Sequence, residues 1–295
     1  MELRQIDYVL AVVDEGSFTK AAASMQVSQP SLSDGIRRLE AELDVRLFHR
    51  LGRSVELTDA GSAFVGPARR LIRDRNAVLE SVAGVQGLRA GTLDFVALST
   101  LAADPLGELV GRFRKAHPGI VVRIAAPDDV ADVDAMVLDG RCELGLTELP
   151  PRRDELVAVP LARQEIVAVC PPRTRLSAPG RLPMARLRDM PLVTTPRGLS
   201  TRDLLDRALA AVGVEPVIAV ETSQREAIGP LVLAGAGTTF LPAGLASTLA
   251  ARGAVVARLV PTLTRTIGLV HRSAPLTPSA RAFVELARPK RKRRR

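Results

Sequence analysis

Residues 17–33, with the sequence SFTKAAASMQVSQPSLS, predict a short helix, a tight turn and the start of a second helix. Ser17 can cap the first helix and Ser28 the second, and Pro30 falls in the first turn of the second helix, where its missing N–H is tolerated. Small side chains at residues 21–23 allow the two helices to cross closely. Such a pair can place its second helix in the major groove of DNA. A helical hairpin that packs against another part of the chain is the alternative.

The second helix has one apolar and one polar side. At roughly 100° per residue, the apolar side carries Leu32, Ile36, Leu39 and Leu43. The opposite side carries Pro30, Asp34, Arg37 and Ala41, with Ser33 and Arg38 beside them. Another helix is predicted upstream by the spacing of Ile6, Val9, Leu10 and Val13. Residues 46–50 and 53–57 flank Leu51-Gly52 and predict a hairpin with a basic tip, which would form a wing.

Residues 1–65 resemble the N-terminal domain of LysR-type transcriptional regulators. Five motifs in matching order and spacing carry the resemblance: residues 18–22 (FTKAA), 27–33 (VSQPSLS), 36–40 (IRRLE), 47–50 (LFHR) and 57–61 (LTDAG). It implies a winged helix-turn-helix DNA-binding domain over residues 1–58 and a body plan that covers the rest of the chain. The candidate DNA contacts are Ser17, Thr19, Gln29, Pro30, Ser31, Ser33, Asp34, Arg37, Arg38, Arg50 and Arg53.

One step departs from the family pattern, which usually has basic or amide residues where this chain has Asp34-Gly35. A carboxylate there would repel phosphate. Asp34 can pair within the helix with Arg37 or Arg38, which we rank first, or accept a hydrogen bond from cytosine N4. Gly35 costs about 1 kcal/mol of helix stability relative to Ala. The operator contacts are therefore expected to differ from those of a typical member.

Positive charge is unevenly distributed along the 295 residues, which have room for about two or three domains. The formal net charge of +9 divides into −1 over residues 1–87, +3 over 88–287 and +7 over 288–295. The DNA-binding domain is therefore not basic overall. The tail 288–295 is expected to be disordered. It is either a solvated end without a function or a segment that attracts DNA phosphates independently of sequence.

Composition points to a globular protein, because 46% of the residues are hydrophobic yet no apolar run reaches the roughly 18 residues that cross a bilayer. Residues 1–4 open directly into an amphipathic helix, so we expect no signal peptide, no membrane partner and a cytoplasmic, bacterial protein. Cys142 and Cys170 belong to no CxxC pattern, which favours free buried thiols. A redox pair of the kind that senses peroxide in some LysR-type members is the alternative.

Residues 59–87 are expected to form a linker helix, capped by Thr58 and running to about Gln86. Its seam, spaced by alternating steps of four and three, consists of Phe64, Ala68, Leu71, Arg75, Val78, Val82 and Val85, widened by Ile72 and Leu79. An amphipathic helix packed on its own chain is the alternative to a dimerisation helix, which the resemblance implies. Paired arms predict a dimer, or a dimer of dimers as a homotetramer, on an operator of approximate two-fold symmetry.

After glycines at 84, 87 and 91, the pattern alternates strand and helix, which predicts parallel or mixed sheets covered by helices. Among these elements we expect one helix over 103–116 and separate strands over 165–169, 255–259 and 266–271.

The resemblance implies that residues 88–287 form a two-lobed α/β effector-binding domain like a type 2 periplasmic binding protein. Lobe I would comprise about 90–161 and 266–287, and lobe II about 162–265. The fold class is thus α+β multidomain: a winged helix-turn-helix, a linker helix and this two-lobed domain.

In such sheets, ligands bind beyond the carboxyl ends of strands, where helix N-termini point. Segments 99–100, 195–201 and 221–223 qualify, and their hydroxyl groups, free N–H groups and one arginine suit a small anion such as a carboxylate. With the end of the strand at 143–147, they supply the candidate effector-binding residues Ser99, Thr100, Thr147, Thr195, Arg197, Gly198 and Thr222. Serines and threonines at helix starts are most often caps, which is the alternative at each position.

These features predict a sequence-specific transcriptional regulator. An effector would close the cleft between the lobes, change the arrangement of subunits and alter the bend or spacing of the bound DNA. RNA polymerase is a further candidate partner. Two other classes of protein are less consistent with the sequence. The helix-turn-helix argues against a transporter's solute-binding protein, and the large ligand-type domain argues against a nonspecific architectural DNA-binding protein.

Enzymatic activity is not expected, because the sequence has no Walker A loop, GxSxG elbow or HExxH helix. His49, His117 and His271 are the only histidines, and none has a recognisable nucleophile near it. We therefore expect no catalytic residue, no metal and no cofactor.

Overall fold

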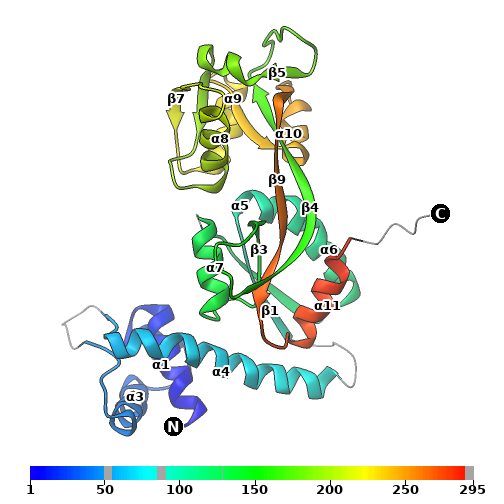
Figure 1. Cartoon of the computed structure of the whole chain (residues 1–295). Helices are drawn as coiled ribbons and strands as arrows, with labels where there is room; N and C mark the ends of the chain where they lie inside the picture. The colour runs from blue at the N-terminus through cyan, green and yellow to red at the C-terminus, as the bar shows by residue number, and fades with distance from the viewer. Residues whose placement is uncertain (50–54, 85–90, 128, 290–295) are drawn as a thin grey trace.

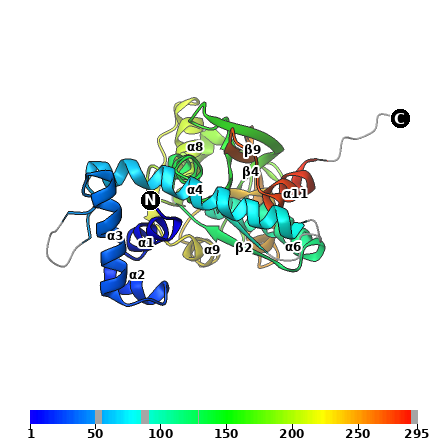
Figure 2. The ribbon, with the colours of Figure 1, turned by 90° about the horizontal axis from the view of Figure 1, so that it is seen from below.

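The computed structural model describes residues 1–49, 55–84, 91–127 and 129–289. Three parts are stacked along the molecule: an N-terminal head crossed by the long helix α4, then lobe I, then lobe II at the far end (Figure 1). The two longest strands, β4 and β9, run from lobe I into lobe II. Seen from below, α4 passes beneath lobe I and carries the head near one of its ends (Figure 2).

The head is built from three short helices, α1 (Leu3–Glu15), α2 (Phe18–Ser24) and α3 (Gln29–Leu43). Ser17 caps α2 and Ser28 caps α3, as the sequence predicts. The shared core of the three helices contains Tyr8, Val9, Val12, Ala21, Ala22, Leu32, Ile36 and Leu39. Leu43, expected in this core, is instead 37% exposed because α3 ends there.

Gly35 has a packing role that its low helix propensity conceals. A methyl group at this position would lie 2.8 Å from Tyr8 Cδ2 and 3.0 Å from Tyr8 Cε2, and the Tyr8 ring is itself buried. The absence of a side chain therefore lets α1 approach α3 and brings the only tyrosine of the chain into the head core.

A buried carboxylate ties α3 to the base of the wing. Glu40 accepts a hydrogen bond from the backbone N–H of Leu47 at 2.8 Å and one from the Arg46 guanidinium at 3.0 Å. An antiparallel bridge between Phe48 and Leu57 then joins the two arms of the hairpin.

The apolar residues of helix α4 (Asp59–Gly84) form two groups, one packed on α1 and one exposed to solvent. Ala68, flanked by Phe64 and Ile72, packs against Ile6 and Leu10 of α1. Three further apolar side chains are exposed, namely Leu71, Val78 and Leu79. Val82 and Val85 of the predicted seam lie outside the described side chains. One side of the helix thus packs on its own chain, as expected for the alternative of an amphipathic helix. Other apolar residues of the helix stay exposed.

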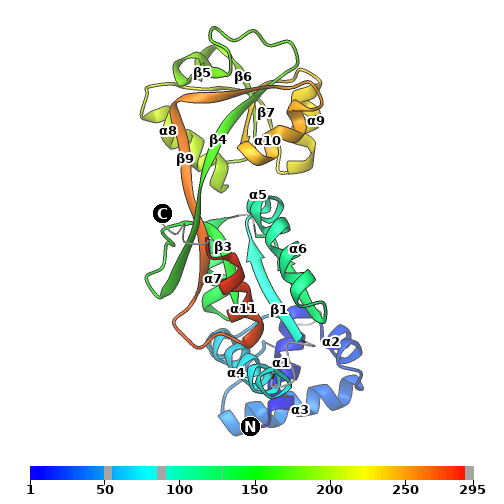
Figure 3. The same cartoon turned by 90° about the vertical axis from the view of Figure 1, so that its right-hand side faces the viewer.

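Lobe I is a sheet covered by helices (Figure 3). β1 pairs in parallel with β2 and β3, and β3 pairs antiparallel with β9. The predicted helix over 103–116 is wrong at its start, because Asp104 is extended and Pro105 follows, so the regular helix begins at Gly107. The elements are β1 (Gly91–Ala97), α5 (Ser99–Leu101), an irregular turn (Ala102–Leu106), α6 (Gly107–Ala116), β2 (Ile120–Ala125), α7 (Val130–Leu138), β3 (Leu144–Leu149) and α11 (Pro278–Ala287).

Lobe II combines the far ends of β4 and β9 with β8 and β5, and adds a small parallel pair, β6 and β7. Its remaining elements are β5 (Arg181–Pro183), a 3₁₀ turn (Met184–Asp189), β6 (Pro191–Thr194), α8 (Ser200–Ala210), β7 (Val217–Glu221), α9 (Arg225–Leu233), β8 (Thr239–Pro242) and α10 (Ala243–Ala250).

β4 (Leu156–Cys170) and β9 (Val255–Arg272) connect the lobes as one antiparallel ribbon. Residues of β4 join the lobe I core at Leu156 and the lobe II core from Ile166, and β9 changes cores between Leu263 and Ile267. The prediction of separate strands over 165–169, 255–259 and 266–271 was wrong. Register irregularities after Pro160 and Ile166 interrupt the side-chain pattern, while the backbone pairing resumes beyond each.

The substitution Gly35→Ala should destabilise the head by about 1–3 kcal/mol, because the overpacking against Tyr8 outweighs the gain in helix propensity. Tyr8 is the only tyrosine and the chain has no tryptophan, so tyrosine fluorescence during urea unfolding of the full chain reports the head alone. The control for helix propensity alone is Gly111→Ala in α6 of lobe I, where an added methyl group meets nothing within 4 Å, and its unfolding is followed by far-UV circular dichroism. A Gly35→Ala head as stable as the wild type would contradict the packing role.

Candidate functional site

The exposed start of α3 presents amide and hydroxyl groups to solvent. Gln29, Pro30 and Ser31 are exposed there. Gln29 Nε2 donates to Ser33 Oγ at 3.2 Å, and Ser28 Oγ donates to Ser31 Oγ at 2.9 Å. These local bonds hold the polar groups at a helix N-terminus, where backbone N–H groups and the helix dipole favour a phosphate oxygen.

Asp34 and Arg37 form an ion pair within α3, the arrangement ranked first from the sequence. Both side chains are about half exposed, so the pair contributes only about 0.2–1 kcal/mol to stability. It nevertheless partly neutralises the carboxylate that would otherwise repel DNA. Arg38 is exposed next to it.

The other predicted DNA contacts belong to α2 and the wing. The Ser17 hydroxyl accepts the α2 cap bond from Lys20 N at 3.4 Å, and Thr19, two residues further along, is exposed. The wing tip with Arg50 and Arg53 lies outside the described residues. The head thus groups the α2 and α3 candidates on neighbouring helices.

A cavity of about 370 Å³ lies between the lobes. Lobe I supplies Ser99, Thr100 and Ala103 at the carboxyl end of β1, and lobe II supplies the rest of the wall. The polar part of the lobe II wall consists of Thr194, Thr195, Thr201, Arg202, Arg225, Glu226, Thr239, Thr248 and Arg252. The apolar part includes Leu205, Ile228, Phe240, Leu241, Leu245 and Leu249. This mixture suits a small molecule with a polar end and an apolar body.

Arg202, and not Arg197, is the arginine that α8 brings to the cavity. Arg202 is 4% exposed, and its Nη1 donates to the carbonyl of Thr195 at 3.0 Å, while its Nε pairs with Asp206 at 2.9 Å. It thereby fixes the loop that carries Thr195. Arg197 is 83% exposed, lies 3.8 Å from Asp206 and does not line the cavity. Leu205 and Leu209, three and seven residues after Arg202, mark the buried side of α8, and this spacing is the signal that could have identified Arg202.

Three more of the predicted effector residues are also absent from the cavity wall. Gly198 N donates to Asp203, and the Thr222 hydroxyl accepts from Gln224 N, so both take part in local turns. Thr147 is fully buried in β3, and its hydroxyl has no hydrogen-bond partner among the described residues. Of the seven candidates, the structure therefore brings Ser99, Thr100 and Thr195 together.

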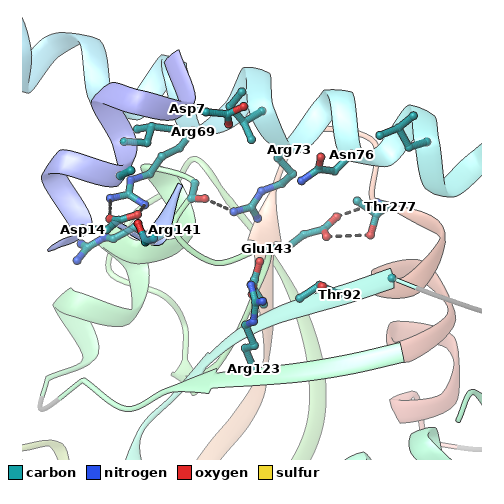
Figure 4. Close-up of a pocket in the computed structure, with 18 of the residues that line it drawn as sticks. Asp7, Asp14, Arg69, Arg73, Asn76, Thr92, Arg123, Arg141, Glu143 and Thr277 are labelled. Atoms are coloured by element: carbon teal, nitrogen blue, oxygen red, sulfur yellow. Dashed lines mark hydrogen bonds and ion pairs between the residues drawn. The ribbon is translucent and has the colours of Figure 1, made fainter. Parts of the chain in front are cut away.

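A second cleft, of about 830 Å³, separates the head and α4 from lobe I (Figure 4). On the head side, Arg69 of α4 pairs with Asp14 of α1. On the lobe side, Arg73 of α4 donates to the carbonyl of Gly140, in the turn between α7 and β3. Arginines one helical turn apart thus connect α4 to α1 and to lobe I, which gives a physical contact between the two domains.

The lobe I wall of this cleft contains acidic groups in partly buried positions. Burial raises the pKa of Asp94, an effect opposed by the nearby charges of Arg123 and Arg73. Glu143 is buried and accepts hydrogen bonds from Thr277, whose backbone N–H lies 2.7 Å and whose hydroxyl lies 2.9 Å from its carboxylate. This carboxylate fixes the start of α11 against lobe I.

The two cysteines lie in different cores and cannot face each other. Cys142 belongs to the core of lobe I and Cys170 to that of lobe II. Burial raises the pKa of both thiols, that of Cys142 to about 12, although a hydrogen bond with Thr238 opposes the rise at Cys170. The redox-pair alternative therefore has no geometric support.

Within the described ranges, no cluster of three or more histidine, cysteine or acidic side chains has the arrangement of a metal site. The helices in the same ranges include none with the length and apolarity needed to span a membrane.

Comparison with known proteins links both parts of the chain to one family. Residues 3–62 match the model of the bacterial regulatory helix-turn-helix proteins of the lysR family, and residues 86–292 match the LysR substrate binding domain. The chain is 30% identical to the transcriptional regulator TfdS of Cupriavidus pinatubonensis over 98% of both chains. It is 31% identical to the regulator IlvR of Caulobacter vibrioides over 97% of both.

Among solved structures, full-length CbnR in complex with its target DNA is similar, with a TM-score of 0.69, 27% identity, and coverage of 97% of this chain and 99% of CbnR. OxyR of Pseudomonas aeruginosa shares the fold, with a TM-score of 0.77 at 24% identity and coverage of 97% of this chain and 93% of OxyR.

Native Cys142 should resist alkylation. With a pKa of about 12, its thiol is ionised at pH 8 in about one molecule in ten thousand, and the thiolate is the reactive form. Mass spectrometry after iodoacetamide treatment should find native protein unlabelled and urea-unfolded protein labelled at both cysteines. Rapid labelling of native Cys142 would contradict its burial.

Proposed function

The chain belongs to the LysR family of bacterial transcriptional regulators, and we propose that a small anionic metabolite bound between lobes I and II controls its binding to DNA. Family membership makes it a DNA-binding regulator with a helix-turn-helix head and an effector-binding domain. The observation that carries the proposal is the 370 Å³ cavity, whose walls come from both lobes. A molecule that contacts both walls binds best to one arrangement of the lobes and therefore shifts the population toward it.

We assign direct DNA contacts to the exposed start of α3. Gln29, Ser31 and Arg37 present amide, hydroxyl and guanidinium groups that can reach base edges or phosphates in the major groove. Ser17 and Thr19, at the start of α2, would contact the backbone. Support comes from the exposure of these residues and from the similar protein CbnR, which is known in complex with its target DNA.

The second cleft supplies a route from the lobes to the head. Arg73 joins α4 to the turn at Gly140 in lobe I, and Arg69 joins α4 to Asp14 in the head. We propose that a change in lobe arrangement alters these contacts and with them the position of the head on DNA. Gly140, which has a φ of +82° and packs against Arg69 and Arg70, makes the close approach of the turn to α4 feasible.

Assembly would use the uncovered side of α4. Leu71, Val78 and Leu79 are exposed apolar residues on this helix, so pairing with a second copy would remove them from water. We propose a dimer that associates further into a homotetramer and reads an operator of approximate two-fold symmetry. Contact with RNA polymerase is the step by which such a complex would change transcription.

The relatives are transcriptional regulators. We propose that this chain likewise has no catalytic activity, uses no cofactor and acts in the cytoplasm, where bacterial DNA is found.

The proposal is tested by a screen of small carboxylates for thermal stabilisation of the full-length protein, followed by binding to the DNA that flanks its own gene. Thr195→Val should weaken binding of the stabilising compound by about 3- to 10-fold, because the valine lacks the hydroxyl group. Its DNA affinity without ligand should equal that of the wild type. The control Thr262→Val changes an exposed residue of β9. Unchanged ligand affinity in Thr195→Val would contradict the cavity as the effector site.

A further inference from the structure

Arg265 is a buried cation at the crossing of the two lobes. It lies on β9, opposite Gln164 of β4, in the stretch where these strands pass from one core to the other. Only 2% of the residue is exposed. Burial lowers the pKa of its guanidinium to about 10, so the group still carries its charge at neutral pH. A charge in this position is costly unless other groups compensate it.

The hydrogen bonds of Arg265 compensate it only in part. Nε donates to Gln164 Oε1 at 2.8 Å, and Nη2 donates to Thr100 Oγ1 at 3.2 Å. Nη1 is buried and has no hydrogen-bond partner among the described residues. No carboxylate in the described part of the chain lies within 4.0 Å of the guanidinium, so Arg265 has no ion-pair partner there.

The two acidic residues whose charges act on Arg265 are engaged elsewhere. Glu148 lies 3.8 Å from Arg207 of α8. The carboxylate of Asp104 lies against the first turn of α10, where a methyl group at Gly244 would come within 2.2 Å of its Oδ2. The positive end of α10 therefore faces Asp104. Neither carboxylate cancels the charge of Arg265 by direct contact.

Thr100 connects Arg265 to the cavity through a hydrogen bond. Its side chain is part of the lobe I wall, whereas Arg265 lies behind this wall and does not line the cavity. Because the Thr100 oxygen already accepts a hydrogen bond from a cation, its hydroxyl hydrogen is available to donate in another direction. The hydroxyl then offers a donor to a ligand, and the partly compensated charge of Arg265 behind it adds a positive potential.

We propose that Arg265 is a positioning residue that makes the interlobe cavity select a carboxylate group at Thr100. The inference rests on the proposed function of this cavity as the effector site. It assigns part of the anion selectivity to Arg265 in place of exposed Arg197, beside the arginines Arg202, Arg225 and Arg252 that line the lobe II wall, and names the ligand class as small organic acids with an apolar body. Arg265 acts through Thr100 and through its charge, without contact with the ligand.

The test compares acids with their uncharged amides: cyclohexanecarboxylate with cyclohexanecarboxamide, and propionate with propionamide. Binding to the full-length protein is measured by calorimetry and thermal shift. In the wild type, at least one acid should bind about tenfold or more tightly than its amide. Arg265→Met should reduce this ratio by about threefold or more, because the lining arginines remain, whereas Arg265→Lys, which keeps the charge, should retain most of the preference. Arg175→Met, on an exposed loop of lobe II, is the control and should behave as the wild type.

Loss of the acid preference in Thr100→Val would support the same assignment and does not depend on the folding of Arg265→Met. An acid preference that is undiminished in both Arg265→Met and Thr100→Val overturns the role of Arg265. Equal binding of acid and amide in the wild type, weakened by Thr195→Val, also overturns the role of Arg265 but still supports the cavity as the effector site. Absence of binding by all four compounds overturns the assigned ligand class.

Discussion

The antiparallel pairing of β4 with β9 is the constraint on which the rest of the structure depends. Both strands contribute side chains to both lobe cores, so each lobe is completed only by a ribbon that it shares with the other. Backbone hydrogen bonds hold the two strands together, and their register shifts after Pro160 and after Ile166, the second shift lying at the lobe II core. The two lobes are therefore joined by a continuous but narrow element, and the cavity takes its walls from other elements of both lobes.

This ribbon also determines where charge is placed. Gln164 and Arg265 face each other across the paired strands, and the arginine reaches Thr100 at the end of β1. A cation at such a crossing is surrounded by elements of both lobes and has little access to water. Arginines of α4 also make contacts within the chain, namely Arg69, Arg73 and Arg75. These three arginines are thus engaged within the chain, and the proposed recognition of DNA relies on the geometry of α3 more than on net charge.

Local sequence signals predicted the head well. The caps at Ser17 and Ser28 and the Asp34–Arg37 pair depend on residues three positions apart, and such interactions form within one helix. Gly35 was identified as costly to the helix, but its purpose depends on Tyr8, which comes from another helix, and no pattern in α3 reveals it. Periodicity likewise could not separate the parts of α4 that pack on α1 from those that stay exposed.

In the two-lobed domain, the sequence-based prediction failed where the structure depends on pairing between segments that are distant in the sequence. Strand boundaries within β4 and β9 were misplaced because the side-chain pattern breaks at each irregularity although the pairing continues. The arginine chosen from the sequence, Arg197, sits in the right loop but points to solvent, while Arg202 and Arg265 approach the cavity from a helix and a strand that looked structural. Their roles follow from partners 7 and 165 positions away along the chain.

Under the proposed function, ligand binding between the lobes and DNA binding by the head are energetically coupled. Coupling of this kind is reciprocal, so the most direct measurement is the dissociation constant of the stabilising acid with and without saturating operator DNA. Saturating DNA should change this constant by the same factor by which the acid changes the affinity for DNA. A dissociation constant unaffected by DNA would contradict the coupling.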